Sequence, residues 1–448
     1  MFNIDNFIFD PCRLILFSKD IDKSVIETYI PNDDDFFDSK WRLDKLPLSS
    51  NINQKLRLPT EGGICLTYKC QLHCNYCSFK STEHSVFQIQ QKDINGFINY
   101  LIKNIVISNF YSDEKKKLEI SFSGGGEPTF DWTIFKQTVE YIKAKCNEHN
   151  IEYELNMTTN GVMSSEQAEY ITNNFHGVMV SFDGLPSLQN QNRNNKNFLS
   201  ADTVIKTIHI FDKSDLVYTI RSSVWQKDFH LLKDIAKFLY EEFNRFDGWS
   251  IMPVIPVGRA LEEHRVKNMF TYKENFIEYY FQVYEYIKNE FKKENIRTPL
   301  IMNDLVGIFC GAVYGEALWL FPDNRIIECL DAIDVSPVLG KIENGIIQLK
   351  DIYYDNLFDK YREKFYECSE CLAYRFCKGG CPIKFLRNGT SSHAAWECSM
   401  TVEYWKTLFK KIWDGESCFG WRLERISIPK HPNMDIYKLK NVIRARVK

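Results

Sequence analysis

Short runs of strand-forming residues recur along the middle of the chain, and each run ends in turn residues. Between them lie longer segments in which apolar residues recur at helical spacing. The predicted strands are Gly63–Tyr68, Leu118–Ser123, Tyr153–Thr158, Val178–Ser181, Leu216–Ser223 and Trp249–Pro253. The predicted helices are Gln90–Ile107, Trp132–Glu148, Ser165–Asn173, Ala201–Asp212, Phe229–Phe243 and Lys273–Glu294. Ser164 and Gln167 fit a capping box that opens the third helix.

This order of elements is typical of an α/β fold. Repeated β–α units favour parallel strands with the helices packed outside them. In such folds the functional residues gather where strands hand over to helices, at the carboxyl ends of the strands. Four motifs follow the first four predicted strands in order: Cys70–Cys77, Gly124–Thr129, Thr159–Gly161 and Ser181–Gly184. We therefore expect one site at this end of the sheet.

Composition and charge exclude several classes of protein. Hydrophobic residues make up 44% and charged residues 26% of the 448 residues, which is typical of a globular chain rather than a disordered one. The net charge of −3 gives no chain-wide attraction to nucleic acid or anionic lipid. The sequence has neither a secretory signal pattern nor a long uncharged apolar run. A cytoplasmic protein with no nucleic-acid or membrane partner is expected.

Fourteen cysteines are many for a cytosolic chain, where clustered cysteines are more often metal ligands or catalytic groups than disulfides. Three of them, Cys70, Cys74 and Cys77, lie within one short segment. Three thiolates can hold three irons of a four-iron cubane and leave the fourth iron open to a small molecule. A zinc site with a fourth ligand such as His73 is the alternative, and the spacing leaves both open.

The order of the motifs is more specific. A Cys-x3-Cys-x2-Cys segment followed, after the next strand, by Gly-Gly-Glu-Pro resembles the radical S-adenosylmethionine (SAM) superfamily over residues 60–295. The resemblance implies a partial (β/α)6 TIM-like barrel and a four-iron cluster on Cys70, Cys74 and Cys77. It also implies reductive cleavage of SAM to a 5′-deoxyadenosyl radical that abstracts a hydrogen atom from the substrate.

The resemblance further implies which residues bind SAM. Gly125, Gly126 and Glu127 would receive its amino group, and an arginine suits its carboxylate because the planar fork gives two parallel hydrogen bonds. Ile251–Arg259 resembles the sixth-strand segment of that family, where backbone groups meet the adenine. The plainer alternatives are a surface turn for Asp183, a solvated side chain for Arg193 and a core strand for Ile251–Arg259. The expected SAM-binding residues are Tyr76, Gly125, Gly126, Glu127, Ser181, Asp183, Arg193 and Val254.

Seven cysteines between residues 305 and 400 resemble the SPASM domain, a small cysteine-rich module that carries two auxiliary iron–sulfur clusters. Asn324 stands where that family usually has glycine, and asparagine tolerates a left-handed turn. A zinc knuckle is the alternative. The resemblance assigns Cys310, Cys329 and Cys381 to the first auxiliary cluster, and Cys368, Cys371, Cys377 and Cys398 to the second. With the radical SAM cluster, three 4Fe–4S clusters are expected.

These motifs divide the chain into four expected segments. They are an N-terminal extension (1–60), the barrel (61–295), the SPASM domain (296–400), and a C-terminal helix with a basic tail (401–448). The tail either contacts an acidic leader peptide or is a solvated end.

SPASM-bearing relatives imply a function on peptides. We expect a maturase that forms a thioether or carbon–carbon crosslink in a ribosomally synthesised peptide. The alternative is an anaerobic sulfatase-maturing enzyme that makes formylglycine from Cys or Ser. Two departures oppose that alternative: Leu330 rather than an acid follows Cys329, and the eighth cysteine usual for that enzyme type is missing between Cys310 and Cys329. Asp331, one residue later, is the candidate base. Expected partners are a precursor peptide, a flavodoxin or ferredoxin as electron donor, and a separate leader-binding protein.

Overall fold

A computed structural model gives the structure of the chain. It describes residues 2–5, 7–10, 15–18, 58–81, 86–111, 115–195, 197–255, 257–262, 273–298, 312, 317–332, 338–350, 371–377, 392–419, 421–425 and 442–447.

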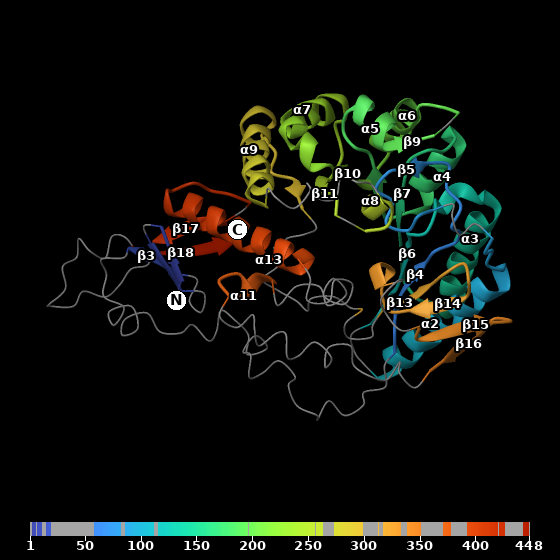
Figure 1. Cartoon of the computed structure of the whole chain (residues 1–448). Coiled ribbons are helices and arrows are strands. Elements are labelled where there is room, and N and C mark those ends of the chain that lie inside the picture. Colours follow the sequence, from blue (N-terminus) through green and yellow to red (C-terminus); the bar gives the residue numbers. More distant parts are fainter. Residues whose placement is uncertain are drawn as a thin grey trace.

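The centre of the fold is a large mixed sheet whose strand order is β12-β11-β10-β8-β7-β6-β4-β13-β14-β15-β16 (Figure 1). Its strands from β12 to β4 run parallel, which confirms the predicted α/β arrangement. The bounds are β4 Glu61–Ile64, β6 Leu118–Phe122, β7 Tyr153–Thr159, β8 Gly177–Ser181, β10 Val217–Val224, β11 Gly248–Pro253 and β12 Ile296–Arg297.

The helices that connect these strands lie along the outside of the curved sheet, as Figure 1 shows. The capping box of the third predicted helix is present, with Ser164 and Gln167 each bonding the other's backbone N–H. The bounds of the helices are α2 Gln91–Tyr111, α3 Trp132–His149, α4 Ser165–Asn174, α5 Pro186–Asn192, α6 Ser200–Asp212, α7 Leu232–Glu242 and α9 Lys273–Phe291.

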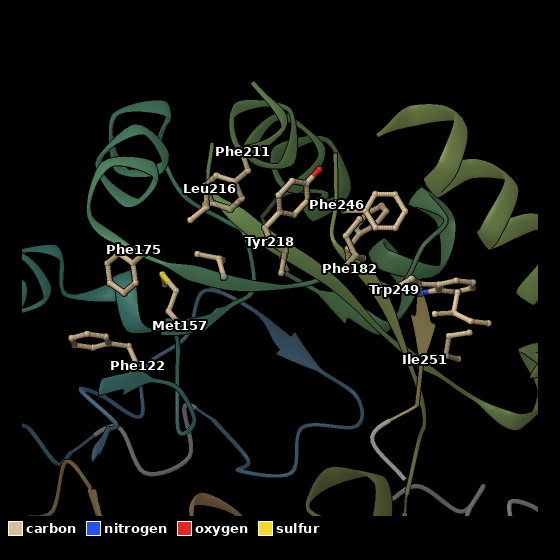
Figure 2. Packing of buried hydrophobic residues seen from close by; sticks show 14 of the residues in the cluster. Phe122, Met157, Phe175, Phe182, Phe211, Leu216, Tyr218, Phe246, Trp249 and Ile251 are labelled. Carbon is tan, nitrogen blue, oxygen red and sulfur yellow. The ribbon is translucent and has the colours of Figure 1, made fainter. Parts of the chain in front are cut away.

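The core lies between the sheet and these helices. On β10 the side chains of Tyr218, Ile220 and Val224 are buried, whereas the alternating Thr219 and Arg221 are half-buried. Figure 2 shows aromatic and aliphatic side chains from β6, β7, β10 and β11 gathered on the same side of the strands, beneath the helices. Since successive side chains of a strand point to opposite faces, the half-buried residues line the concave face of the sheet. That face carries the polar groups.

Most predicted elements match the observed ones to within a few residues, and the first strand is the main exception. It ends at Ile64 rather than at the predicted Tyr68. The backbone N–H of Cys65 still bonds the Leu320 carbonyl at 2.9 Å, but Tyr68 is then used in a small separate core with Cys65 and Phe321. The fifth predicted helix, Phe229–Phe243, also differs, because a 3-10 turn, η3 (Gln226–Leu231), precedes α7.

Strands from the cysteine-rich region extend the barrel sheet instead of forming a detached unit. Strand β13 (Ala317–Leu320) pairs in parallel with β4, and β14 (Arg325–Ile327) pairs antiparallel with β13. Strands β15 (Gly340–Glu343) and β16 (Ile346–Leu349) complete this edge. Asn324, in the β13–β14 turn, has φ +64°, so the predicted left-handed turn is confirmed.

The two ends of the chain meet in a second sheet of order β1-β2-β3-β18-β17. Strands β1 Phe2–Ile4, β2 Phe7–Asp10 and β3 Ile15–Ser18 come from the start, and β17 Trp421–Arg425 and β18 Val442–Val447 from the basic tail. Helix α13 (Ser392–Trp413) packs beside this sheet, with Phe7 stacked on Trp413 at 5.1 Å (Figure 1). The tail therefore contributes two paired strands.

Within the described residues, no helix combines the length and the apolar character needed to cross a membrane.

Candidate functional site

The three-cysteine loop follows β4 at the carboxyl end of the parallel strands. Cys70, Cys74 and Cys77 are half-buried. The sulfurs of Cys70 and Cys77 already accept hydrogen bonds, since the Leu72 N–H lies 3.4 Å from Cys70 Sγ and the Ser81 N–H lies 3.4 Å from Cys77 Sγ. Backbone N–H groups directed at cysteine sulfur are a regular feature of iron–sulfur sites, where they tune the potential. The donor set and its surroundings therefore fit a cluster ligated by three cysteines.

Burial raises the pKa of Cys70 to about 11 and that of Cys74 to about 12. Both are therefore neutral thiols at pH 7 until a metal displaces their protons, because coordination to a cation deprotonates a thiol. His73, the alternative zinc ligand, is exposed and pairs through its backbone with Asn194. Across the described residues, no three Cys, His, Asp or Glu side chains are placed to hold a single metal ion.

The glycine turn after β6 packs directly against the start of this loop. Gly124 and Gly125 have φ of +82° and +67°, a conformation that favours glycine. A Cβ on Gly126 would lie 2.0 Å from the Lys69 carbonyl oxygen, so only glycine fits there. The N–H groups of Gly126 and Glu127 donate to the Thr67 and Lys69 carbonyls at 2.8 and 2.9 Å. The turn and the loop thus form one backbone-linked unit.

The Glu127 carboxylate is buried and is satisfied within the protein. It accepts from the Thr159 hydroxyl at 2.7 Å, the Asn160 N–H at 2.7 Å and the Thr129 hydroxyl at 3.0 Å. Burial raises the pKa of Glu127, and these hydrogen bonds act in the opposite direction. Its side chain joins the turns after β6 and β7, which leaves backbone groups of the turn as the contacts available to a ligand.

A second network surrounds Asp183, which follows β8. Its carboxylate accepts from the Tyr76 hydroxyl at 2.6 and 2.8 Å, from Arg193 Nε at 2.9 Å and from the Ser223 N–H at 3.3 Å. The Arg193 guanidinium carbon lies 5.3 Å from the centre of the Tyr76 ring. Burial alone would lower the pKa of Arg193, but the neighbouring Asp183 carboxylate raises it. Both members of this ion pair are almost fully buried.

This network is tied to the cysteine loop by a short antiparallel pairing. Strand β5 (His73–Cys74) pairs with β9 (Arg193–Asn194), so Cys74 lies opposite Arg193. Tyr76 comes from the same loop and Asp183 from the end of β8. The structure therefore brings Tyr76, Asp183 and Arg193 together as one cluster beside the loop. Arg193 and Asp183 are neither solvated nor a surface turn, which excludes the plainer alternatives for both.

The remaining predicted SAM-binding residues flank this cluster. Ser181 is half-buried and pairs with Arg221 across β8 and β10. Val254 is buried with Trp225 and Ala260, and Tyr76 packs against them. The small cluster that contains Val254 therefore packs against the same loop residue that bonds Asp183.

Sequence reasoning assigned no role to two arginines of this region. Arg259 is buried and bonds the cysteine loop through both its backbone and its side chain. Arg221 projects from the concave face of β10, and burial lowers its pKa while the attraction of Asp331 acts against that shift. An arginine among the small polar residues of the predicted strand was the available signal for Arg221.

The described part of the cysteine-rich region reaches this site. Cys329 and Leu330 pack against the small core of Cys65, Tyr68 and Phe321. Leu330 covers the glycine turn closely, since a Cβ on Gly124 would lie 2.1 Å from it. The other predicted cluster ligands are either half-buried (Cys371, Cys377), exposed on α13 (Cys398), or outside the described residues (Cys310, Cys368, Cys381).

Comparisons with known proteins agree with this geometry. The family model of the Radical SAM superfamily matches residues 64–222. A cysteine-type anaerobic sulfatase-maturating enzyme of Clostridium perfringens is 23% identical over 363 residues, covering 77% of this chain and 94% of that enzyme.

Solved structures share the fold over most of the chain. The structure of anSMEcpe with bound AdoMet and Cp18Cys peptide gives a TM-score of 0.60 at 18% identity, covering 79% of this chain and 97% of that one. Streptococcus suis SuiB bound to the precursor peptide SuiA gives a TM-score of 0.54 at 18% identity, covering 87% and 98%.

Proposed function

Because the chain is a radical SAM enzyme that is similar to an anaerobic sulfatase-maturating enzyme and shares its fold with SuiB, we propose that it is a peptide maturase that crosslinks a ribosomally synthesised precursor peptide. Cys70, Cys74 and Cys77 would hold the radical SAM cluster. When bound, that cluster supplies the electron that splits SAM into methionine and the 5′-deoxyadenosyl radical.

The observation that carries the proposal is the convergence of three sequence-distant segments on the cysteine loop. The glycine turn bonds its first residues, β9 pairs with Cys74, and Asp183 holds Tyr76. This arrangement supports a SAM site between the loop and the ends of the strands. Backbone groups of Gly125 and Gly126 are the proposed contacts for the methionine amino group, and Glu127 fixes that turn from behind.

The other end of SAM would meet the segments after β8 and β11. Ser181 is the proposed partner of the ribose or the carboxylate, with Arg193 beside it. The Nε of Arg193 already donates to Asp183, so the terminal nitrogens of Arg193 are the proposed donors to the SAM carboxylate. Tyr76 and the buried segment around Val254 are the proposed neighbours of the adenine.

A peptide substrate is supported by the position of the cysteine-rich region, because Leu330 covers the glycine turn and Cys329 packs beside it against the core of Cys65 and Tyr68. A peptide bound beside the glycine turn would be close to both the proposed radical SAM cluster and the auxiliary cluster proposed on Cys329. Crosslinking removes one hydrogen atom, which would convert the 5′-deoxyadenosyl radical into 5′-deoxyadenosine, and then one proton and one electron as the new bond forms. The auxiliary clusters proposed on the seven SPASM cysteines would supply an acceptor for that electron, and Asp331 is the proposed acceptor for the proton. Holding both partners in place favours bond formation over escape of the radical.

A second candidate function is formylglycine formation on a sulfatase, and one observation favours it. The sulfatase-maturating relative aligns over 94% of its own length. Two sequence features oppose it: Asp331 stands one residue later than expected for that enzyme type, and no further cysteine lies between Cys310 and Cys329. A cytoplasmic location, a flavodoxin or ferredoxin as electron donor, and a separate leader-binding protein belong to the first proposal.

The test is mass spectrometry of peptides incubated anaerobically with the reconstituted enzyme, SAM and a reductant. Two substrates are compared: a peptide encoded by a short reading frame beside this gene, and a cysteine peptide of sulfatase type. Crosslinking removes a pair of hydrogen atoms and creates no carbonyl, whereas formylglycine reacts with a hydrazide probe. If SAM is cleaved but neither peptide changes, the peptide proposal is wrong.

A further inference from the structure

Arg259 is the first residue of the short helix α8 (Arg259–Glu262), which follows β11, and it bonds the cysteine loop through both its side chain and its backbone. Its Nη1 donates to the Cys74 carbonyl at 3.1 Å, and its Nη2 donates to the Ser81 carbonyl. Its backbone N–H donates to the Cys77 carbonyl at 3.0 Å. One residue therefore bonds the carbonyls of two of the three predicted cluster ligands and the far end of the loop.

The approach of this segment to the loop is close enough to fix its position. Gly258 has φ +55°, and a Cβ there would lie 2.2 Å from the Cys77 carbonyl oxygen and 2.6 Å from Ser78. Both contacts are to backbone, which cannot move aside as a flexible side chain can. The segment after β11 thus packs against the loop backbone without a layer of side chains between them.

The contact at Ser81 reaches the third ligand position as well. The Ser81 N–H donates to Cys77 Sγ at 3.4 Å, and its hydroxyl lies 3.2 Å from the same sulfur. Because the Arg259 guanidinium bonds the Ser81 carbonyl, it also fixes the Ser81 N–H and hydroxyl that lie against Cys77 Sγ. Arginine suits the task because its planar fork presents donors in fixed directions, whereas lysine presents a compact point charge.

The opposite side of the loop is held by a different element. Cys74 pairs with Arg193 across β5 and β9, and the Asn75 N–H donates to the Asn192 carbonyl at 3.0 Å. These bonds fix Cys74 but do not reach Cys77. Within the loop the Cys77 N–H donates to the Cys74 carbonyl at 3.3 Å, and Arg259 adds a bond to the carbonyl of each of these two cysteines from the side of β11.

We propose that Arg259 is a positioning residue for the radical SAM cluster. It holds Cys74 and Cys77 in register and couples them to the segment directly after β11, which begins with Val254. The proposal rests on the proposed cluster on Cys70, Cys74 and Cys77. Its consequence is that binding of SAM against the β11 segment and the geometry of the cluster depend on each other through Arg259.

The test compares Arg259→Lys and Arg259→Gln with wild type in the full-length, anaerobically reconstituted protein. The matched control is Arg245→Lys, because Arg245 also donates to a backbone carbonyl, that of Ser214 at 2.6 Å, but lies outside the loop. Three quantities are measured: iron per chain, the electron paramagnetic resonance spectrum of the reduced protein with and without SAM, and the SAM dissociation constant.

We expect the SAM-induced change in the spectrum to be lost or broadened in both Arg259 variants. The SAM dissociation constant should rise by up to about tenfold, because the lost hydrogen bond from a charged group lies between α8 and the cysteine loop and acts on SAM only through the loop. Arg245→Lys should match wild type. Arg259→Lys should not restore the wild-type spectrum, because one ammonium cannot bond the Cys74 and Ser81 carbonyls in the same directions as the guanidinium does.

Other outcomes separate the proposal from its premise. If both Arg259 variants fold with wild-type spectra and SAM affinity, Arg259 is only a structural residue and the inference is wrong. Gly258→Ala serves as a second variant if the arginine variants do not fold, since it presses on the Cys77 carbonyl and keeps the guanidinium. A wild-type spectrum for that variant would also overturn the inference. A wild-type protein without any SAM-sensitive signal would instead refute the proposed cluster.

Discussion

Replacing Asp183 by Asn is the sharpest test of the network beside the cysteine loop. Asparagine keeps the shape and the oxygen that accepts from Arg193 Nε and the Ser223 N–H. It removes the charge that balances a guanidinium whose side chain is only 8% exposed. Breaking a buried ion pair from one side costs about 3–5 kcal/mol, because the other charge stays buried without compensation. We expect a loss of about 3 kcal/mol in the free energy of unfolding, the low end of that range.

Urea unfolding followed by far-ultraviolet circular dichroism measures this loss. The control is Asp215→Asn, which removes the carboxylate of the exposed Arg245–Asp215 pair. Exposed pairs contribute about 0–1 kcal/mol, so the control should change little. Adding Arg193→Gln to Asp183→Asn should recover part of the loss, because the orphaned charge is then gone. A loss for Asp183→Asn no larger than that of the control would refute the reasoning.

Three further changes test other parts of the account. Glu127→Gln should lower the free energy of unfolding by about 1–3 kcal/mol. The amide NH2 group cannot accept a hydrogen bond, so either the Asn160 N–H or the Thr129 and Thr159 hydroxyls lose their acceptor. A calorimetric melt checks this loss. Gly126→Ala should lower the melting temperature and weaken iron loading, since its Cβ would lie 2.0 Å from the Lys69 carbonyl oxygen; an unchanged melt would count against the linked turn and loop. Reconstitution should give about twelve irons per chain for three four-iron clusters, whereas about four irons with tightly bound zinc would support a zinc knuckle.

The sequence was sufficient to predict the strands from Leu118 onward and the end of the sheet that carries the site. Both follow from local periodicity and from the rule that parallel strands present their carboxyl ends together. The left-handed Asn324 could be predicted for the same kind of local reason. The end of the first strand could not be predicted. Tyr68 looks like a strand residue in the sequence, but it packs into a small core with Phe321, a residue distant in the chain.

The contacts that hold the cysteine loop also lay beyond local patterns. The pairing of β5 with β9 involves two residues on each side, which is too short to leave a periodic signal. Arg259 acts on backbone carbonyls, and those carry no sequence identity. The sheet formed by both ends of the chain depends on Ile15–Ser18 meeting Val442–Val447, and no local pattern encodes such a distant pairing.

The most direct test of the central claim is SAM cleavage by wild type and by Cys74→Ala, both reconstituted and reduced under anaerobic conditions. Wild type should release 5′-deoxyadenosine and methionine. Cys74→Ala should release neither, while keeping about eight of about twelve irons in the auxiliary clusters. Undiminished 5′-deoxyadenosine from Cys74→Ala, or none from fully loaded wild type, would contradict a radical SAM cluster on this loop.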